Sequence, residues 1–193
     1  MQSSLDLQEW FGGIDIYLFD QLLKGRFVPG MRVLDAGCGS GRNLIYFLRS
    51  GYEVFGVDES EQAIAQTRQL AADLAPDLPA DNFRVEPVER MSFGKEANGR
   101  QQTAGRLSAD FADHTEQKSN QQAALSGQQS ELSRTENMSG FDVVLSSAVL
   151  HFARDEQQWQ AMVNEMWRVL ESGGIFFARL ASTIGMEDRV RLV

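Results

Sequence analysis

The chain contains a single cysteine among its 193 residues, so it forms no internal disulfide and a reducing compartment is expected. No apolar run approaches the length that spans a membrane, and the N-terminus lacks the basic start and apolar stretch of a signal peptide. The chain has 18 basic and 27 acidic residues, which gives a net charge of −9. This charge argues against the backbone of a nucleic acid as the main partner. We therefore expect a cytoplasmic protein with no membrane or nucleic-acid partner.

Short apolar runs alternate with helix-like segments along the chain, whose length fits a single domain with a sizeable core. The expected strands are residues 31–35, 53–57, 82–86, 141–146 and 175–180. The expected helices are residues 5–24, broken at Gly12 and Gly13, then 42–49, 61–73 and 155–170. This alternation predicts an α/β fold with a doubly wound, mostly parallel sheet and right-handed crossovers.

The last expected helix has an apolar face, which we assign to the core. Its apolar residues recur at helical spacing, and they are Trp159, Met162, Val163, Met166, Trp167 and Leu170. Residues 171–174, Glu-Ser-Gly-Gly, are expected to end this helix before the fifth strand. Ser60 is the expected N-cap of the helix at 61–73.

Residues 94–139 differ in composition from the rest of the chain. They are rich in Gln, Ser, Ala, Asn, Glu and Thr, and their apolar residues are too sparse to cover a core. We therefore predict a disordered insert that leaves the domain from one loop. A lid or a partner-binding arm is the functional alternative for this segment.

The strongest functional signal is the segment from Val33 to Gly41, which reads Val-Leu-Asp-Ala-Gly-Cys-Gly-Ser-Gly. A short apolar run ends at Asp35, and three glycines follow at alternate positions. Glycines permit positive φ and close approach of a ligand, while the N–H groups that open the next helix bind an anionic group. Dinucleotide enzymes favour G-x-G-x-x-G, whereas the spacing here is D-x-G-x-G-x-G. Cys38 is interpreted as a small residue that fits the turn.

Polar side chains follow four of the expected strands, and they are Asp35, Asp58, Glu86 and Ser146. Ligands of such sheets bind beyond the carboxyl ends of the strands, so these side chains are expected to face one site. Asp58 follows the last glycine by somewhat under twenty residues, at the place where nucleotide folds put a carboxylate on the ribose hydroxyls. A carboxylate accepts two hydrogen bonds side by side, which suits a cis-diol.

These motifs resemble those of the class I S-adenosylmethionine (SAM) methyltransferases, and Gly-Ser-Gly-Arg-Asn at 39–43 is similar to the tellurite-resistance-type branch and its small-molecule relatives. The likeness runs from about residue 31 to 181, interrupted by the insert. It implies a Rossmann-like fold, methyl transfer from SAM to an unidentified small-molecule acceptor, S-adenosylhomocysteine as the product and no metal. The family adds two strands after the fifth. Residues 183–193 are too few for them, so we expect a sheet that lacks these strands and a possible homo-oligomer through its open edge.

The resemblance also implies a set of cofactor contacts. Asp35 and the glycine turn would hold the methionyl part of SAM, Asp58 the ribose hydroxyls and Ser146 would lie near the methionyl amine. Glu59 would flank the adenine. The full set is Asp35, Ala36, Gly37, Cys38, Gly39, Ser40, Gly41, Arg42, Asn43, Asp58, Glu59, Val88, Glu89 and Ser146.

The adenine side departs from the family pattern. Pro87 stands where the family usually has an acid, when Met-Ser-Phe at 91–93 is aligned on the usual Leu-Pro-Phe. Val88 still offers its backbone N–H, and Glu89 is the candidate for the missing polar contact.

His151 follows the fourth strand and is the candidate catalytic base; the alternative is a histidine that only orders the loop. Arg42 either contacts the ligand or faces solvent. Asp15 and Tyr17 are candidates for a lid over the cofactor, and Arg179 for a contact to the substrate. Two other functions stay open, a nicotinamide-dependent oxidoreductase and a SAM-binding module without catalysis.

Overall fold

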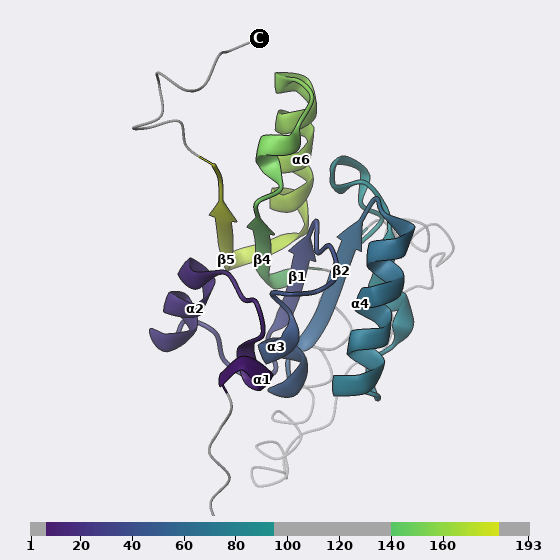
Figure 1. Ribbon diagram of the computed structural model, residues 1–193. Coiled ribbons are helices and arrows are strands. Elements are labelled where there is room, and N and C mark those ends of the chain that lie inside the picture. Colours follow the sequence, from purple (N-terminus) through teal and green to yellow (C-terminus); the bar gives the residue numbers. More distant parts are fainter. Residues whose placement is uncertain (1–6, 95–139, 182–193) are drawn as a thin grey trace, which may run out of the picture. The chain divides into compact units, whose positions relative to one another are not determined.

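The computed structural model describes residues 7–94 and 140–181. The chain divides into two units, residues 1–92 with 140–193 and residues 93–139. The elements of the first unit, shown in Figure 1, are α1 (Leu7–Phe11), α2 (Ile16–Leu23), β1 (Arg32–Ala36), α3 (Ile45–Arg49), β2 (Glu53–Asp58), α4 (Glu61–Leu74), η1 (Ala80–Asn82), β3 (Phe83–Val85), η2 (Val88–Arg90), β4 (Phe141–Ser147), η4 (Leu150–Phe152), α6 (Glu156–Val169) and β5 (Leu170–Arg179). The prediction of disorder for residues 94–139 lies, apart from Gly94, outside the described residues.

The five strands form one parallel sheet in the order β3-β2-β1-β4-β5. This confirms the doubly wound α/β fold expected from the sequence. β1 lies at the centre, where Asp35 is the register partner of Gly56 on β2 and of Leu145 on β4. The carboxyl ends of β1, β2 and β4 therefore meet at one edge of the sheet, next to the point where the strand order reverses.

Helices cover both faces of the sheet. Val33 and Val143 belong to an apolar cluster that also contains Leu18 of α2, Phe47 of α3 and Ile64 of α4. The alternate strand residues, such as Leu34 and Val144, are equally buried but lie outside this cluster, as do Met162 and Met166 of α6. Because alternate residues of a strand point to opposite faces, the sheet is buried on both sides, as a parallel sheet requires.

The helix boundaries in the first half follow local sequence signals. α1 ends at Phe11, beside Gly12, which has a φ of +54°, and Asp15 then caps α2 by accepting hydrogen bonds from the N–H groups of Tyr17 and Leu18. Ser60 Oγ accepts from the N–H of Ala63 and caps α4, as expected. The expected helix at 42–49 is shorter, because turns occupy residues 42–44 and α3 begins only at Ile45.

Two expectations about the C-terminal part are wrong. Residues 171–174 do not end a helix: α6 ends at Val169, and Leu170 already pairs with Phe141 as the first residue of β5. Residues 171–174 instead lie at a shift in the register of β4 and β5, between the pairs Phe141–Leu170 and Val143–Ile175. A glycine is needed at position 174, because a Cβ there would come 2.9 Å from the carbonyl oxygen of Asp142. The two tryptophans assigned to the core are exposed, Trp159 by 38% and Trp167 by 55%, because the buried stripe of α6 is narrower than the apolar pattern.

β5 is an edge strand within the described residues, which agrees with the expected open edge. Association of two copies through this edge stays a prediction. Across residues 7–94 and 140–181, no helix has both the length and the apolar character needed to cross a membrane.

Candidate functional site

A cavity of about 320 Å³ opens at the carboxyl ends of β1, β2 and β4. Its volume falls in the range of small-molecule sites. The lining residues come from the glycine turn, the end of β2, the segment after β3, the segment after β4 and α6; they are Gly37, Asp58, Glu59, Pro87, Val88, Glu89, Ala148, Val149, Phe152, Gln158 and Met162. The cavity therefore lies where the strand ends predicted a ligand.

Backbone hydrogen bonds anchor the glycine turn to β2. The N–H groups of Gly37 and Cys38 both donate to the carbonyl oxygen of Val57, at 2.8 and 2.9 Å. Gly37 has a φ of +83°, and a Cβ at this position would lie 2.5 Å from Cγ2 of Val149. Only glycine fits here, because the conformation and the lack of space both exclude a side chain.

Asp58 fixes the geometry of the turn from the end of β2. Its Oδ2 accepts a hydrogen bond from the N–H of Gly39, and its Oδ1 accepts one from the N–H of Ser60, both at 2.9 Å. These bonds hold the carboxylate still, and each oxygen keeps a lone pair for a further donor. A carboxylate that is fixed and borders a cavity suits a pair of ligand hydroxyls.

Asp35 and Ser146 are buried polar side chains that lack a hydrogen-bond partner among the described residues. They lie on adjacent strands near the carboxyl edge of the sheet: Asp35 is on β1, and its register partner on β4 is Leu145, the residue before Ser146. Burial raises the pKa of Asp35 to about 7, against an opposing effect of Arg42 and with a smaller increase from Asp58. Unsatisfied buried polar groups are rare in folded proteins, so Asp35 and Ser146 mark a place where a ligand would find partners for a polar or cationic group.

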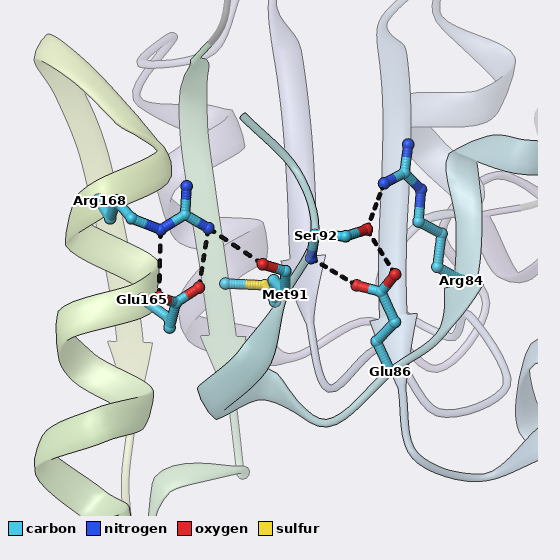
Figure 2. A network of polar contacts seen from close by, with 6 residues as sticks. All are labelled: Arg84, Glu86, Met91, Ser92, Glu165 and Arg168. Atoms are coloured by element: carbon cyan, nitrogen blue, oxygen red, sulfur yellow. Dashed lines mark hydrogen bonds and ion pairs between the residues drawn. The ribbon is translucent and has the colours of Figure 1, made fainter. Parts of the chain in front are cut away.

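A short segment after β3, residues 86–92, contributes Pro87, Val88 and Glu89 to the cavity wall; we call it the strap. Its two ends are tied together, as Figure 2 shows: Ser92 donates from its N–H and its Oγ to the two oxygens of Glu86, at 2.7 and 2.5 Å. Arg84 of β3 donates to Ser92 Oγ at 2.6 Å. Glu86, expected to face the ligand, thus holds the strap in place.

Two contacts attach the strap to α6. Arg168 donates to the carbonyl oxygen of Met91 at 3.1 Å while Glu165 holds the same guanidinium (Figure 2). Gln158 Nε2 donates to Glu89 Oε1 at 3.0 Å. Both members of this second pair line the cavity, so the wall is preformed and one carboxylate oxygen of Glu89 stays available to a ligand.

The N-terminal segment reaches the same edge of the sheet through Asp15. The N–H of Asp15 donates to Asn43 Oδ1 at 3.0 Å, which links this segment to the end of the glycine turn. Its Oδ2 accepts from Ser147 Oγ at 3.1 Å and from Arg179 Nη1 at 2.8 Å. Asp15 therefore lies near the carboxyl ends of β4 and β5, whereas the side chain of Tyr17 is exposed. Neither residue is among those that line the cavity, so the lid stays a prediction.

A family model described as methyltransferase domain matches residues 16–189, which is most of the chain. The chain belongs to this family. The class I resemblance stated from the glycine motif is thereby confirmed, and the cofactor of the methyltransferase domain is SAM. The residues present fit SAM, because its methionyl ammonium would meet the buried and unpartnered Asp35 and its ribose would meet the fixed carboxylate of Asp58.

Solved structures share the fold of the methyltransferase domain at low identity. The PH0226 protein from Pyrococcus horikoshii OT3 has a TM-score of 0.54 and 21% identity, covering 90% of this chain and 56% of that one. An S-adenosylmethionine-dependent methyltransferase from Clostridium acetobutylicum ATCC 824 has a TM-score of 0.51 and 12% identity, with 90% and 50% covered. A protein from work on conversion of a disulfide bond into a thioacetal group during echinomycin biosynthesis has a TM-score of 0.52 and 23% identity, with 87% and 50% covered.

One curated protein, Hemagglutinin 1 from Eikenella corrodens, is 36% identical over 58 residues. The match covers 30% of this chain and 19% of that protein. The chain thus spans about a fifth of this curated relative and about half of the structures above.

Five of the expected cofactor contacts line the cavity: Gly37, Asp58, Glu59, Val88 and Glu89. The others are not among its lining residues; they are Asp35, Ala36, Cys38, Gly39, Ser40, Gly41, Arg42, Asn43 and Ser146. The side chain of Arg42 is exposed. Cys38 is buried and burial raises the pKa of its thiol, so it fills space as expected. No group of three or more His, Cys, Asp or Glu that could hold a metal exists in the part of the chain that the structure describes.

His151 lies on η4, exposed to solvent, and is not among the residues that line the cavity. Its ring centroid is 4.3 Å from that of Phe152, which does line it. The role of His151 as a base therefore stays a prediction. Phe152, Gln158 and Met162 line the cavity without having been predicted from the sequence, because the packing of α6 against the strap and against η4 brings them there.

Proposed function

We propose that this domain transfers a methyl group from SAM to a small-molecule acceptor. The observation that carries the proposal is the unpartnered pair of Asp35 and Ser146, buried at the carboxyl ends of β1 and β4, the strand ends at which the cavity lined by the fixed carboxylate of Asp58 opens. SAM supplies an activated methyl group through its sulfonium. The protein has to bind it, aim it at the acceptor and exclude water.

Each wall of the cavity has a part in this binding. We assign Asp58 to the ribose hydroxyls, Asp35 with Ser146 to the methionyl ammonium, and the N–H of Val88 with the carboxylate of Glu89 to the adenine. The ties of the strap to β3 and α6 hold the adenine wall before the ligand arrives, which lowers the entropy lost on binding.

Replacing Asp58 with alanine should weaken binding of S-adenosylhomocysteine by about 1–3 kcal/mol, because charge-assisted hydrogen bonds to the ribose are lost. Isothermal titration calorimetry measures this directly. Asp73→Ala is the matched control, since Asp73 is an exposed carboxylate on α4 that contacts only Gln69 within the described residues. A folded Asp58→Ala variant that binds as tightly as the parent would show that the ribose assignment is wrong.

Replacing His151 with alanine should slow methyl transfer while the affinity for SAM stays unchanged, because a base acts on the acceptor and not on the cofactor. The rate is followed with isotopically labelled SAM once an acceptor has been found in a panel of hydroxyl, amine and thiol compounds. Unchanged turnover would leave His151 with a structural role beside Phe152.

A SAM-binding module without catalysis is the second candidate, favoured by the exposure of His151 outside the cavity lining. One measurement distinguishes the two functions. A methyltransferase converts labelled SAM to S-adenosylhomocysteine in the presence of an acceptor, whereas a module binds both compounds and converts neither. Calorimetry with NAD on the same sample tests the oxidoreductase, for which we expect no binding.

A further inference from the structure

Arg179 is the last residue of β5, and its guanidinium group lies at the carboxyl edge of the sheet with only some of its donors in hydrogen bonds. Its Nη1 donates to Asp15 Oδ2 at 2.8 Å, and the side chain is 43% exposed. Within residues 7–94 and 140–181, neither Nε nor Nη2 makes a hydrogen bond. One side of the guanidinium is therefore fixed, and further donors remain open to a ligand.

The carboxylate that holds this guanidinium is itself firmly placed. The side chain of Asp15 is fully buried, and it also caps α2 and accepts from Ser147 Oγ. Because Asp15 has these other partners, Arg179 is not its only source of stabilisation. An arginine held in this way loses little side-chain entropy when it binds an anion.

Arg179 is a close neighbour of the cofactor cavity. Its register partner on β4 is Ser147, and its carbonyl oxygen accepts a hydrogen bond at 3.0 Å from the N–H of Ala148, which lines the cavity. The ring of Tyr17, mostly exposed, lies 5.6 Å from the guanidinium carbon. A cation and an aromatic face thus stand side by side next to the carboxyl ends of β4 and β5.

We propose that Arg179 binds an anionic group of the methyl acceptor, a carboxylate or a phosphate, with Tyr17 contacting the body of the molecule. This deepens the proposed function and rests on it. A guanidinium pairs with either anion through two parallel N–H bonds, so its open donors select a planar or tetrahedral oxyanion over a neutral group. Asp15 acts as a positioning residue, which orients the guanidinium.

The probes are benzoate, phenyl phosphate and the neutral benzamide, titrated into the protein with saturating S-adenosylhomocysteine and followed by ligand-detected NMR. We expect one of the two anions to bind and benzamide not to bind, and the comparison of the anions distinguishes a carboxylate from a phosphate. Arg179→Gln should weaken anion binding at least about tenfold, the loss that removal of one charge-assisted bidentate contact produces.

Two further variants make the test specific. Asp15→Asn retains one oxygen that can cap α2 but places its amide NH2 group, which cannot accept a hydrogen bond, beside Arg179, so the guanidinium loses its fixed orientation and anion binding should weaken severalfold. Lys24→Gln removes an exposed cation from the end of α2, where Lys24 pairs with Asp20, and should change nothing. A salt bridge with a purely structural role predicts no change in anion binding from Asp15→Asn.

The outcomes separate this inference from the function on which it rests. Equal anion binding by the parent and Arg179→Gln, or binding of neither anion by the parent, would overturn the role of Arg179 and leave SAM binding untouched. Failure of S-adenosylhomocysteine to bind the parent would overturn the proposed function instead. The titrations are repeated without S-adenosylhomocysteine, so the anion result is obtained in either case.

Discussion

Affinity for SAM is expected to fall about 100-fold between pH 8 and pH 5, because a buried Asp35 with a pKa of about 7 must ionise to receive the methionyl ammonium. At pH 5 only about 1% of the molecules carry the ionised form, and the apparent dissociation constant rises in proportion. Calorimetry at several pH values measures the slope. At pH 6, titrations in two buffers with different ionisation enthalpies should show release of close to one proton on binding.

The raised pKa of Asp35 also makes the stability of the unliganded domain depend on pH: stability falls as the pH rises, whereas affinity for SAM increases. Its folded-state value of about 7 exceeds the ordinary value of 3.8, so the folded domain keeps a proton that the unfolded chain has released. The contribution of this retained proton to the free energy of unfolding is fully present below about pH 4 and is lost as the pH rises to 7. Asp35→Asn should bind SAM more weakly at pH 8 and with little dependence on pH. An equally steep dependence in this variant would assign the titration to another group.

Replacing Gly37 with alanine should lower the free energy of unfolding by about 3–5 kcal/mol, the sum of overpacking and backbone strain. The new Cβ would lie 2.5 Å from Cγ2 of Val149, at a φ of +83° that L-residues rarely adopt. Urea denaturation measures the loss, and binding of S-adenosylhomocysteine should weaken in parallel because the turn borders the cavity.

Gly30→Ala is the matched control, since Gly30 has a φ of +89° and a Cβ added there would meet nothing within 4 Å. It should lose only about 1–2 kcal/mol, the strain without the clash. Adding Val149→Ala to Gly37→Ala should restore part of the difference, because it removes the two nearest atoms. Equal losses at Gly37 and Gly30 would show that contact with Val149 is unimportant.

The parts of the site that depend on neighbours in sequence were predictable. The D-x-G-x-G-x-G spacing located the turn, and Asp58 at the end of a strand located the carboxylate, because parallel strands bring their carboxyl ends to one edge. Ser60, as an N-cap residue, similarly predicted where α4 begins.

The parts that depend on distant packing were not predictable. Asp15 and Arg179 are 164 residues apart, and nothing in either local sequence indicates the pair. Trp167 fits the apolar period of α6, but it stays exposed, with its ring tilted by 43° against that of Phe176 and 5.3 Å between the ring centroids. Glu86 follows a strand as a ligand-binding acid would, yet both of its oxygens bind Ser92.

The strand order has a consequence for synthesis of the chain on the ribosome. β1 pairs on one side with β2, which follows it closely, and on the other with β4, as in the bond between Arg32 and Asp142, 110 residues apart. A nascent chain that has exposed only β1, β2 and β3 therefore has the glycine turn and Asp58 but neither Val149 nor Arg179. All residues that line the cavity are present only after α6 has emerged, and until β4 has emerged an incomplete polypeptide exposes one unpaired side of the central strand β1 to chaperones.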